Sequence, residues 1–149
     1  MKTDNDSRIC PDVRLDHRPL AMRTDPDPVL RKHCATVQKF DSALRAFAQE
    51  MLVFMRQSSG IGLAAPQVGV LQRIVVVDVG GSPLCLANPV IVAGSGTDSM
   101  VEGCLSLPGV EVDVRRKTSL EIYADNLEGE QVRLDVDGLL ARVLQHELD

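Results

Sequence analysis

Two helical patterns enclose a series of strand-like segments in this chain, and that order is the feature that most restricts its fold. Residues 41–60 carry apolar side chains at helical spacing, which are Leu44, Phe47, Ala48, Met51, Phe54 and Met55. Residues 138–149 hold a second helical pattern, whose apolar face is Leu140, Val143 and Leu144. Between them lie segments that are continuously apolar or alternate as strands do, at 73–79, 84–92, 110–114, 118–124 and 131–136. A helix, a series of strands and a final helix predict an α+β fold.

Individual residues add detail to this fold. Residues 73–79, RIVVVDV, are apolar on both faces, which predicts a central strand. Pro89 has no backbone N–H and directs its strand toward a sheet edge or a bulge. Asp41 or Ser42 is expected to cap the long helix, and Gly60 follows its end where a C-cap glycine is common. We expect mixed, mainly antiparallel strands packed around the C-terminal helix, with a second long helix before the first of the motifs discussed below.

The length and charge of the chain limit its class. Its 149 residues suit a single domain, and a net charge of −5 without a long basic cluster argues against nucleic-acid binding. No stretch approaches the roughly 20 apolar residues that a membrane span needs, and the acidic N-terminus does not resemble a secretory signal or a transit peptide. We therefore expect a cytoplasmic protein with a tail at residues 1–23 and one domain at residues 24–149.

The chain has four cysteines but no C-x-x-C spacing. Without an export signal, reduced thiols or one metal ligand are expected rather than disulfides. Cys10, Cys34 and Cys85 stand in no motif and are interpreted as structural. His17 and His33 have no ligand spacing and are expected on the surface.

The last five residues, QHELD, open the pattern H-E-x-x-H. On a helix this pattern places two imidazoles one turn apart beside a carboxylate, which suits a metal ion and a general base. His146 would be the first imidazole and Glu147 the base, while position 150 lies beyond the sequence. Because His-Glu pairs are common on amphipathic helices, an ordinary helix surface is the alternative.

A second motif, EGCLSLPG at residues 102–109, surrounds a cysteine with residues that bend the backbone. Gly103 and Pro108 make the interior of a regular strand an unsuitable place for Cys104. The alternative interpretation of this thiol is a small buried apolar residue.

A third motif, GIGLAAPQVG at residues 60–69, is rich in small residues. Gly60, Gly62 and Ala65 match the dinucleotide fingerprint, but that fingerprint needs a strand before it and a helix after it, and the order here is reversed. Small residues in a row instead indicate backbone that approaches another group closely. Gln67 is the polar side chain that this segment offers.

Together, GIGLAAPQ, EGCLS and HELD resemble the peptide deformylase family in order and in spacing, and PDPVLRKHC is similar to its N-terminal segment. The resemblance covers roughly residues 24–149. It implies a hydrolase that removes the formyl group from N-formylmethionine at the start of new bacterial or organellar polypeptides. It also implies one divalent ion, usually iron(II), held by a cysteine and two histidines. Zinc, nickel and cobalt are alternatives, since Cys and His ligands suit zinc as well as iron.

The resemblance assigns roles to the residues of the three motifs. Cys104 and His146 correspond to metal ligands and Glu147 to the general base. Gln67 and the backbone N–H of Leu105 correspond to the donors that stabilise an oxyanion, a contribution that is typically worth about 10²–10³ in rate for one donor.

Residues for substrate binding follow from the same resemblance. Gly60 and Gly62 correspond to backbone beside the substrate peptide, and Gly62 to the residue that pairs with it. Ile61 and Val143 are expected to form walls of the methionine pocket.

Glu102 orients the site in this resemblance. Its alternative is a solvent-facing acid. Arg115 or Arg116 is expected to pair with it.

A third ligand would stand at position 150, directly after Asp149. We expect the sequence to be a fragment of a longer protein, so that the activity of the 149-residue chain by itself is open. The alternatives are a ligand from a partner chain or from Asp149, and an inactive relative that only binds peptides. A generic zinc peptidase is a further alternative, but it gives no role to EGCLS or GIGLAAPQ. The expected partners are an N-formylmethionyl peptide and, through the nascent chain, the ribosome, without a membrane or a nucleic acid.

Overall fold

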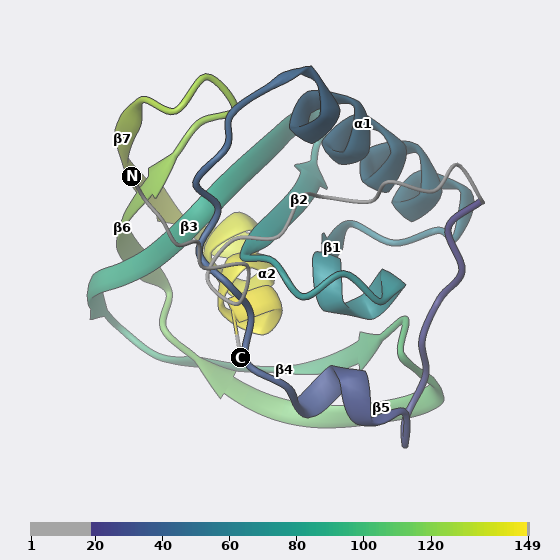
Figure 1. Cartoon of the computed structure of the whole chain (residues 1–149). Helices are drawn as coiled ribbons and strands as arrows, with labels where there is room; N and C mark the ends of the chain where they lie inside the picture. The colour runs from purple at the N-terminus through teal and green to yellow at the C-terminus, as the bar shows by residue number, and fades with distance from the viewer. Residues whose placement is uncertain (1–18, 149) are drawn as a thin grey trace.

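The computed structural model describes residues 19–148, and its elements follow the predicted order (Figure 1). The helices are α1 (Ser42–Gln57) and α2 (Gly138–Leu148), and two short 3₁₀ turns are η1 (Pro28–Arg31) and η2 (Ala65–Val68). The strands are β1 (Gly62–Ala64), β2 (Ile74–Val79), β3 (Ser82–Ser95), β4 (Asp98–Cys104), β5 (Leu107–Arg116), β6 (Ser119–Asp125) and β7 (Gln131–Asp137). Within this described part of the chain, no helix is long and apolar enough to cross a membrane.

The strands form two separate sheets. A five-stranded sheet has the order β1-β2-β3-β6-β7, and β4 and β5 pair only with each other as a hairpin. All strand pairs are antiparallel. Figure 1 shows the hairpin along the lower rim of the molecule, apart from the larger sheet. The predicted α+β class with mainly antiparallel strands is confirmed.

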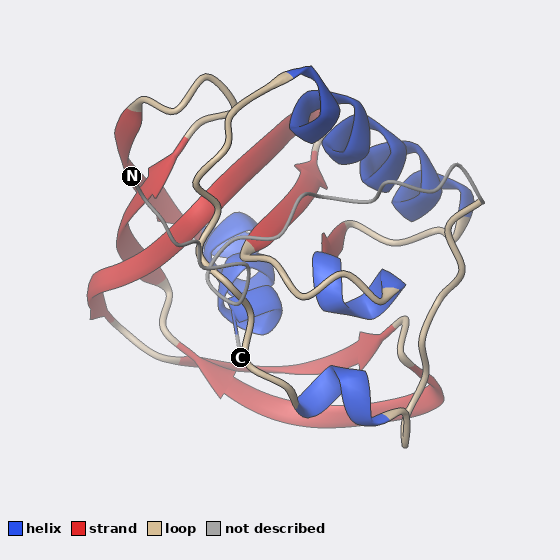
Figure 2. Ribbon diagram, in the orientation of Figure 1, coloured by secondary structure: helices blue, strands red, loops and turns tan. Residues whose placement is uncertain are grey.

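Strand β2 is shared by two apolar cores. Ile74 and Val76 pack with the apolar stripe of α1, whereas Val75 and Val77 pack with the buried residues of α2. Because successive side chains of a strand point to opposite faces, one strand contributes to both clusters. β2 lies between β1 and β3, which confirms the predicted central strand, and Figure 2 shows the two helices apart with β2 between them.

The ends of α1 are partly as predicted. The side chain of Asp41 caps the first turn by accepting a hydrogen bond from the backbone N–H of Leu44 at 3.0 Å. At the other end the left-handed residue is Ser59, with φ of 62°, and not Gly60. Gly60 is small for another reason, because an added Cβ would stand 2.6 Å from Cδ1 of Leu105.

A β-bulge interrupts β3 at Asn88 and Pro89. The register between β3 and β6 shifts between Ala87 and Val90, so the bulge predicted from Pro89 is confirmed. The edge position was wrong, because β3 pairs with β2 on one side and with β6 on the other. Asn88 adopts a positive φ of 53° at this point. Because residues at a bulge are left out of the regular ladder, Pro89 is tolerated there although it has no backbone N–H to donate.

Strand β4 was not predicted from the sequence. Most of its residues are exposed, as are most residues of β5, so the alternation that marks a half-buried strand is weak there. β5 also extends well beyond the predicted 110–114. Cys104 is the last residue of β4 and lies at a register shift, in agreement with its expected place outside a regular strand interior.

The predicted N-terminal tail is described only from residue 19 onward, and this part contacts the body of the protein. Leu20 and Met22 pack against the core beneath α1, and the backbone N–H of Arg23 donates to the carbonyl of Gln67 at 2.7 Å. The boundary at residue 24 stays a prediction. Cys10, His17 and Asp149 lie outside the described residues.

Candidate metal centre

The three sequence motifs meet at one place in the fold. Gln67 from η2 donates a hydrogen bond through Nε2 to Sγ of Cys104 at the end of β4, over 3.6 Å. The ring of His146 from α2 hydrogen-bonds the same Cys104 side chain. Residues that are far apart in the sequence thus bring a thiol, an imidazole and an amide together.

The side chain of Gln67 is buried and fixed at both ends. Its Oε1 accepts from the backbone N–H of Ala64 at 2.9 Å, so Nε2 must point away from β1. Nε2 also donates to Oγ of Ser106 at 3.2 Å. The amide is therefore oriented with its donor toward Cys104.

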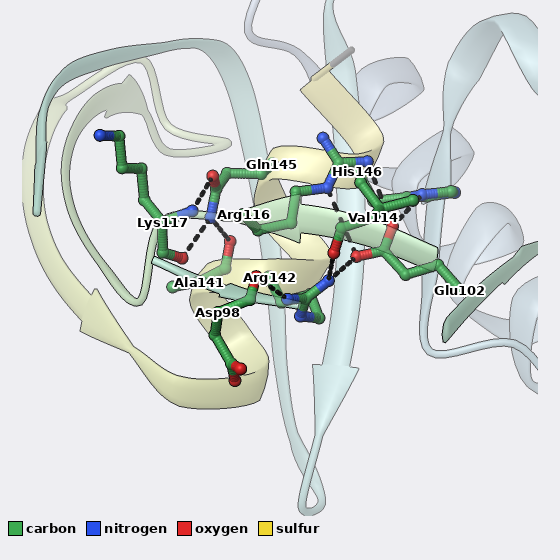
Figure 3. A network of polar contacts seen from close by, with 9 residues as sticks. All are labelled: Asp98, Glu102, Val114, Arg116, Lys117, Ala141, Arg142, Gln145 and His146. Atoms are coloured by element: carbon green, nitrogen blue, oxygen red, sulfur yellow. Dashed lines mark hydrogen bonds and ion pairs between the residues drawn. The ribbon is translucent and has the colours of Figure 1, made fainter. Parts of the chain in front are cut away.

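Glu102 holds the imidazole of His146 through one of its ring nitrogens. Oε1 of Glu102 lies 3.1 Å from Nδ1 of His146 (Figure 3), which leaves Nε2 as the ring nitrogen available to another partner. A carboxylate bound to the other ring nitrogen is how metal-ligating histidines are commonly held. The alternative of a solvent-facing acid at Glu102 is therefore wrong.

Two arginines surround Glu102. Arg116 bonds it at 3.1 Å, which decides between the two predicted partners in favour of Arg116, and Arg142 of α2 bonds its Oε2. Burial opposes the ionisation of Glu102, but the hydrogen bonds from Arg116, Arg142 and His146 outweigh it and keep its pKa below the usual range.

The pKa of His146 is raised to about 9 in the metal-free chain. The main cause is the hydrogen bond with Cys104, which burial of the ring opposes, and the charge of Glu147 and the hydrogen bond with Glu102 raise the pKa further. The ring is thus surrounded by groups that favour a cation beside them. A metal ion is a cation that could take the place of the proton.

The side chain of Glu147, near the end of α2, packs against Gly62 of β1. Burial raises its pKa to about 7, although the charge of His146 opposes this shift. A carboxyl group with a pKa near neutrality can both accept and return a proton at physiological pH, as a general base must.

An open cleft of about 720 Å³ reaches these groups. Its lining residues include Gln67, Cys104, Ser106, His146 and Glu147. The residues predicted to bind substrate do not line this cleft. They are Gly60, Ile61, Gly62, Glu102 and Val143. Leu105 does not line it either. Ile61 is 44% exposed and Val143 of α2 is buried in the core, so their pocket roles stay predictions.

Three polar residues of the site had no assigned role in the sequence analysis. Ser106 belongs to the quoted EGCLS motif but carries no ligand signal of its own. Arg142 and Gln145 are buried on α2 among its apolar residues. Arg142 precedes His146 by four residues, and this spacing on one helix face was the signal that could have identified it.

The donor set suits a divalent ion that prefers sulfur and nitrogen, because a thiol and an imidazole face each other while a carboxylate holds the second ring nitrogen. Within residues 19–148, no group of three or more His, Cys, Asp and Glu could hold a metal ion. Cys104 and His146 are two neighbouring sulfur and nitrogen donors of the kind that such an ion binds. The next position on the same helix face, one turn after His146, is position 150, beyond the given sequence.

The fold and this arrangement of donors beside a carboxyl of near-neutral pKa define a metal-dependent hydrolase. A family model described as Polypeptide deformylase matches residues 19–149. The peptide deformylase of Alkaliphilus metalliredigens is 44% identical over 128 residues, which cover 86% of this chain and 87% of that protein. This chain belongs to the peptide deformylase family.

Solved structures agree with this assignment. The crystal structure of peptide deformylase from Thermotoga maritima superposes with a TM-score of 0.86 at 41% identity, covering 89% of this chain and 91% of that one. A peptide deformylase from Synechococcus elongatus in complex with actinonin gives a TM-score of 0.85 at 41% identity, covering 93% and 76%. The fold is thus shared along most of the chain.

The function follows from the family. Peptide deformylases are metalloenzymes that act on peptides, and this chain is a hydrolase that removes the N-formyl group from N-formylmethionyl peptides of newly made proteins. The alternative of a binding protein without activity has no support, because the relatives are named as enzymes.

Proposed function

We propose that Cys104 and His146 hold the divalent ion of the deformylation reaction, with Glu147 as general base and Gln67 as oxyanion donor. The observation that carries this proposal is the meeting of three motifs at the Cys104 thiol, which contacts Nε2 of Gln67 at 3.6 Å and is also a hydrogen-bond partner of the His146 ring. The ion, when bound, acts as a Lewis acid that activates water and polarises the formyl carbonyl.

Glu147 moves the proton in this proposal. Its pKa of about 7 lets the carboxylate take a proton from the attacking water and return it to the leaving amine. The close packing of Gly62 against Glu147 keeps this carboxyl at the start of β1, where the GIGLAAPQ segment meets α2.

Gln67 and the backbone N–H of Leu105 stabilise the oxyanion that develops on the formyl oxygen. Support for Gln67 comes from its fixed orientation, because both ends of its amide are bonded before any substrate arrives. Donors oriented in advance contribute most when they need no rearrangement during the reaction. Support for Leu105 comes from its position, because it directly follows Cys104 and its backbone N–H therefore belongs to the same peptide unit as the Cys104 carbonyl.

We propose iron(II) as the native ion, with zinc, nickel and cobalt as alternatives, since a thiolate and an imidazole accept all of them. The substrate is the formylated end of a nascent chain, and the ribosome is the partner that presents it. The cytoplasmic location stays a prediction, which cell fractionation would test.

Substrates that differ only in the formyl group test the proposal. The chain, loaded anaerobically with iron(II), should release formate from formyl-Met-Ala-Ser and leave Met-Ala-Ser intact. Glu147→Gln preserves the size of the side chain but cannot accept a proton, so turnover should fall by about 10²–10⁴ while the metal stays bound. Cleavage of unformylated Met-Ala-Ser would favour the zinc peptidase, and undiminished turnover by Glu147→Gln would remove Glu147 from this role.

A further inference from the structure

The hairpin β4–β5 carries one metal ligand of the proposed site, yet it belongs to a different sheet from the body of the protein. Cys104 and Glu102 stand on β4, whereas His146 stands on α2. Their meeting therefore depends on how the hairpin is attached to α2.

Arg142 makes most of this attachment from one buried side chain. Its guanidinium bonds Oε2 of Glu102, donates to the carbonyl of Val114 at 3.0 Å and donates to the carbonyl of Asp98 at 2.8 Å (Figure 3). These acceptors lie on both strands of the hairpin, so a single planar group joins β4, β5 and α2. Only 7% of the side chain is exposed, which makes each of these bonds part of a desolvated charge network.

Gln145, the residue before His146, completes the attachment at the base of the hairpin. Its Oε1 accepts from the backbone N–H of Lys117 at 2.8 Å, and its Nε2 donates to the carbonyl of the same residue at 2.8 Å. Lys117 directly follows β5, so the exit of the hairpin is fixed to the helix turn that bears His146.

We propose that Arg142 and Gln145 form a clamp that positions Cys104 and Glu102 against His146, and that Arg142 is the positioning residue on which the geometry of the metal site depends. The inference rests on the proposed function insofar as Cys104 and His146 are the metal ligands. Neither clamp residue is among those that line the cleft.

Arginine is suited to this task and lysine is not. Three acceptors in different directions match the planar fork of a guanidinium, whereas an ammonium on a flexible stem cannot hold all three in place. Removing Arg142 also leaves Glu102 with a weaker set of partners, so the carboxylate that orients His146 loses part of its own support.

Alkylation of the cysteines in the metal-free chain tests the clamp without reference to catalysis. Cys34, Cys85 and Cys104 are free and partly buried, and mass spectrometry can follow the labelling of each one by iodoacetamide. Arg142→Met should raise the labelling rate of Cys104 by about tenfold or more, because the hairpin leaves α2, while Cys34 and Cys85 keep their wild-type rates. The labelling rate of Cys104 in Arg142→Lys should lie between the rates of the wild type and of Arg142→Met. The matched control is Arg133→Met, which removes two exposed ion pairs, with Glu121 and Asp135, and should change none of the three rates.

Two results would overturn the clamp. Equal acceleration at all three cysteines would mean that Arg142 only supports global stability, and unchanged labelling of Cys104 would mean that the hairpin is held by other contacts.

Zinc protection of Cys104 then separates the clamp from the proposed metal site. In the wild type, zinc should slow the alkylation of Cys104, and Arg142→Met should need about 10–100 times more zinc for the same protection. If Arg142→Met accelerates Cys104 labelling but zinc protects it as in the wild type, Arg142 holds the hairpin without setting the metal geometry, and the positioning role is wrong. If zinc never protects the wild type, the proposed metal site fails, and the selective labelling of Cys104 still decides whether the clamp exists.

Discussion

Gly62 of β1 lies against Glu147 of α2 so closely that no side chain fits between them. A Cβ on Gly62 would stand 2.7 Å from Oε2 of Glu147 and 2.7 Å from Cγ1 of Val143. The proposed general base is thus positioned by the backbone of the GIGLAAPQ segment. The small residues of this segment predicted that its backbone approaches another group closely, and at Gly62 that group is helix α2.

Substitution of Gly62 by alanine should displace Glu147. Overpacking at a buried contact costs about 1–3 kcal/mol of unfolding free energy, and misplacement of a reacting group by about 1 Å can reduce turnover about 10²-fold. Urea unfolding and formate release would measure the two effects. Gly94→Ala is the matched control, because its added Cβ would stand 3.1 Å from Cγ of Lys117 and 3.2 Å from Cδ2 of Leu120, and its turnover should stay at the wild-type level. A Gly62→Ala protein with full turnover would show that Glu147 tolerates displacement.

Substitution of Gln67 by alanine should leave the metal bound and slow the reaction. The amide is held toward Cys104 by Ala64 and Ser106 and is not itself an expected ligand. Loss of one oxyanion donor typically lowers kcat by about 10²–10³. Metal content by elemental analysis and kcat with a formylated peptide would be measured on the same sample. Turnover at the wild-type level with full metal content would remove Gln67 from the mechanism.

Metal binding should strengthen as pH rises toward 9. The pKa of His146 is raised to about 9 in the metal-free chain, so its ring carries a proton at neutral pH that the ion must displace. Below that pKa, each pH unit should weaken zinc binding by about tenfold through this group alone. Zinc titrations at about pH 6.5, 7.5 and 8.5 would measure the slope. His146→Asn should lose most of the affinity, and an affinity that does not change with pH would contradict the displaced proton.

Asn88 should contribute to stability in two separable ways. Its side chain bonds the N–H and the carbonyl of Val37 at 2.8 and 2.9 Å and Asp125 at 2.8 Å, and its φ is positive. Asn88→Gly keeps the backbone conformation but loses the bonds, which should cost about 1–3 kcal/mol. Asn88→Ala adds about 1–2 kcal/mol of left-handed strain. Urea denaturation should therefore rank wild type above Gly above Ala, and an alanine variant as stable as the glycine variant would show that the strain is relieved elsewhere.

Much of the fold was predictable because its two cores leave clear patterns in the sequence. The stripe of α1 and the doubly apolar β2 repeat with the periods of a helix and of a buried strand, and both elements form as predicted. Strand β4 was missed because a hairpin outside the main sheet is largely exposed and its sequence has no strong alternation. The position of Ser59 was missed because glycine is the usual residue there, and the space around Leu105 that requires Gly60 is a tertiary contact.

The site residues that belong to a sequence motif were predictable, whereas a residue whose role depends on tertiary contacts was not. Cys104, His146 and Gln67 come together as their motifs indicated. Arg142 could not be assigned a partner, because Asp98, Glu102 and Val114 reach it only through a hairpin that the sequence did not reveal.

Because both faces of β2 are apolar, burial of apolar side chains does not by itself define the register of this strand. Val75 and Val76 serve opposite cores, so a slip by one residue would exchange valines between cores at little cost in burial. Polar contacts at the C-terminal end of the strand therefore help to fix the alignment. Arg56 bonds Asp78 at 2.6 Å, and Asp78 donates its N–H to the carbonyl of Ile61 at 2.9 Å.

That alignment decides which residue of β1 meets the final helix. With Gly62 opposite Val77, the gap beside Glu147 receives a residue without a side chain. A shift by one place would bring the isoleucine or the leucine on either side into that gap. An ion pair on the far side of the sheet thus protects the proposed proton-transfer group from steric exclusion.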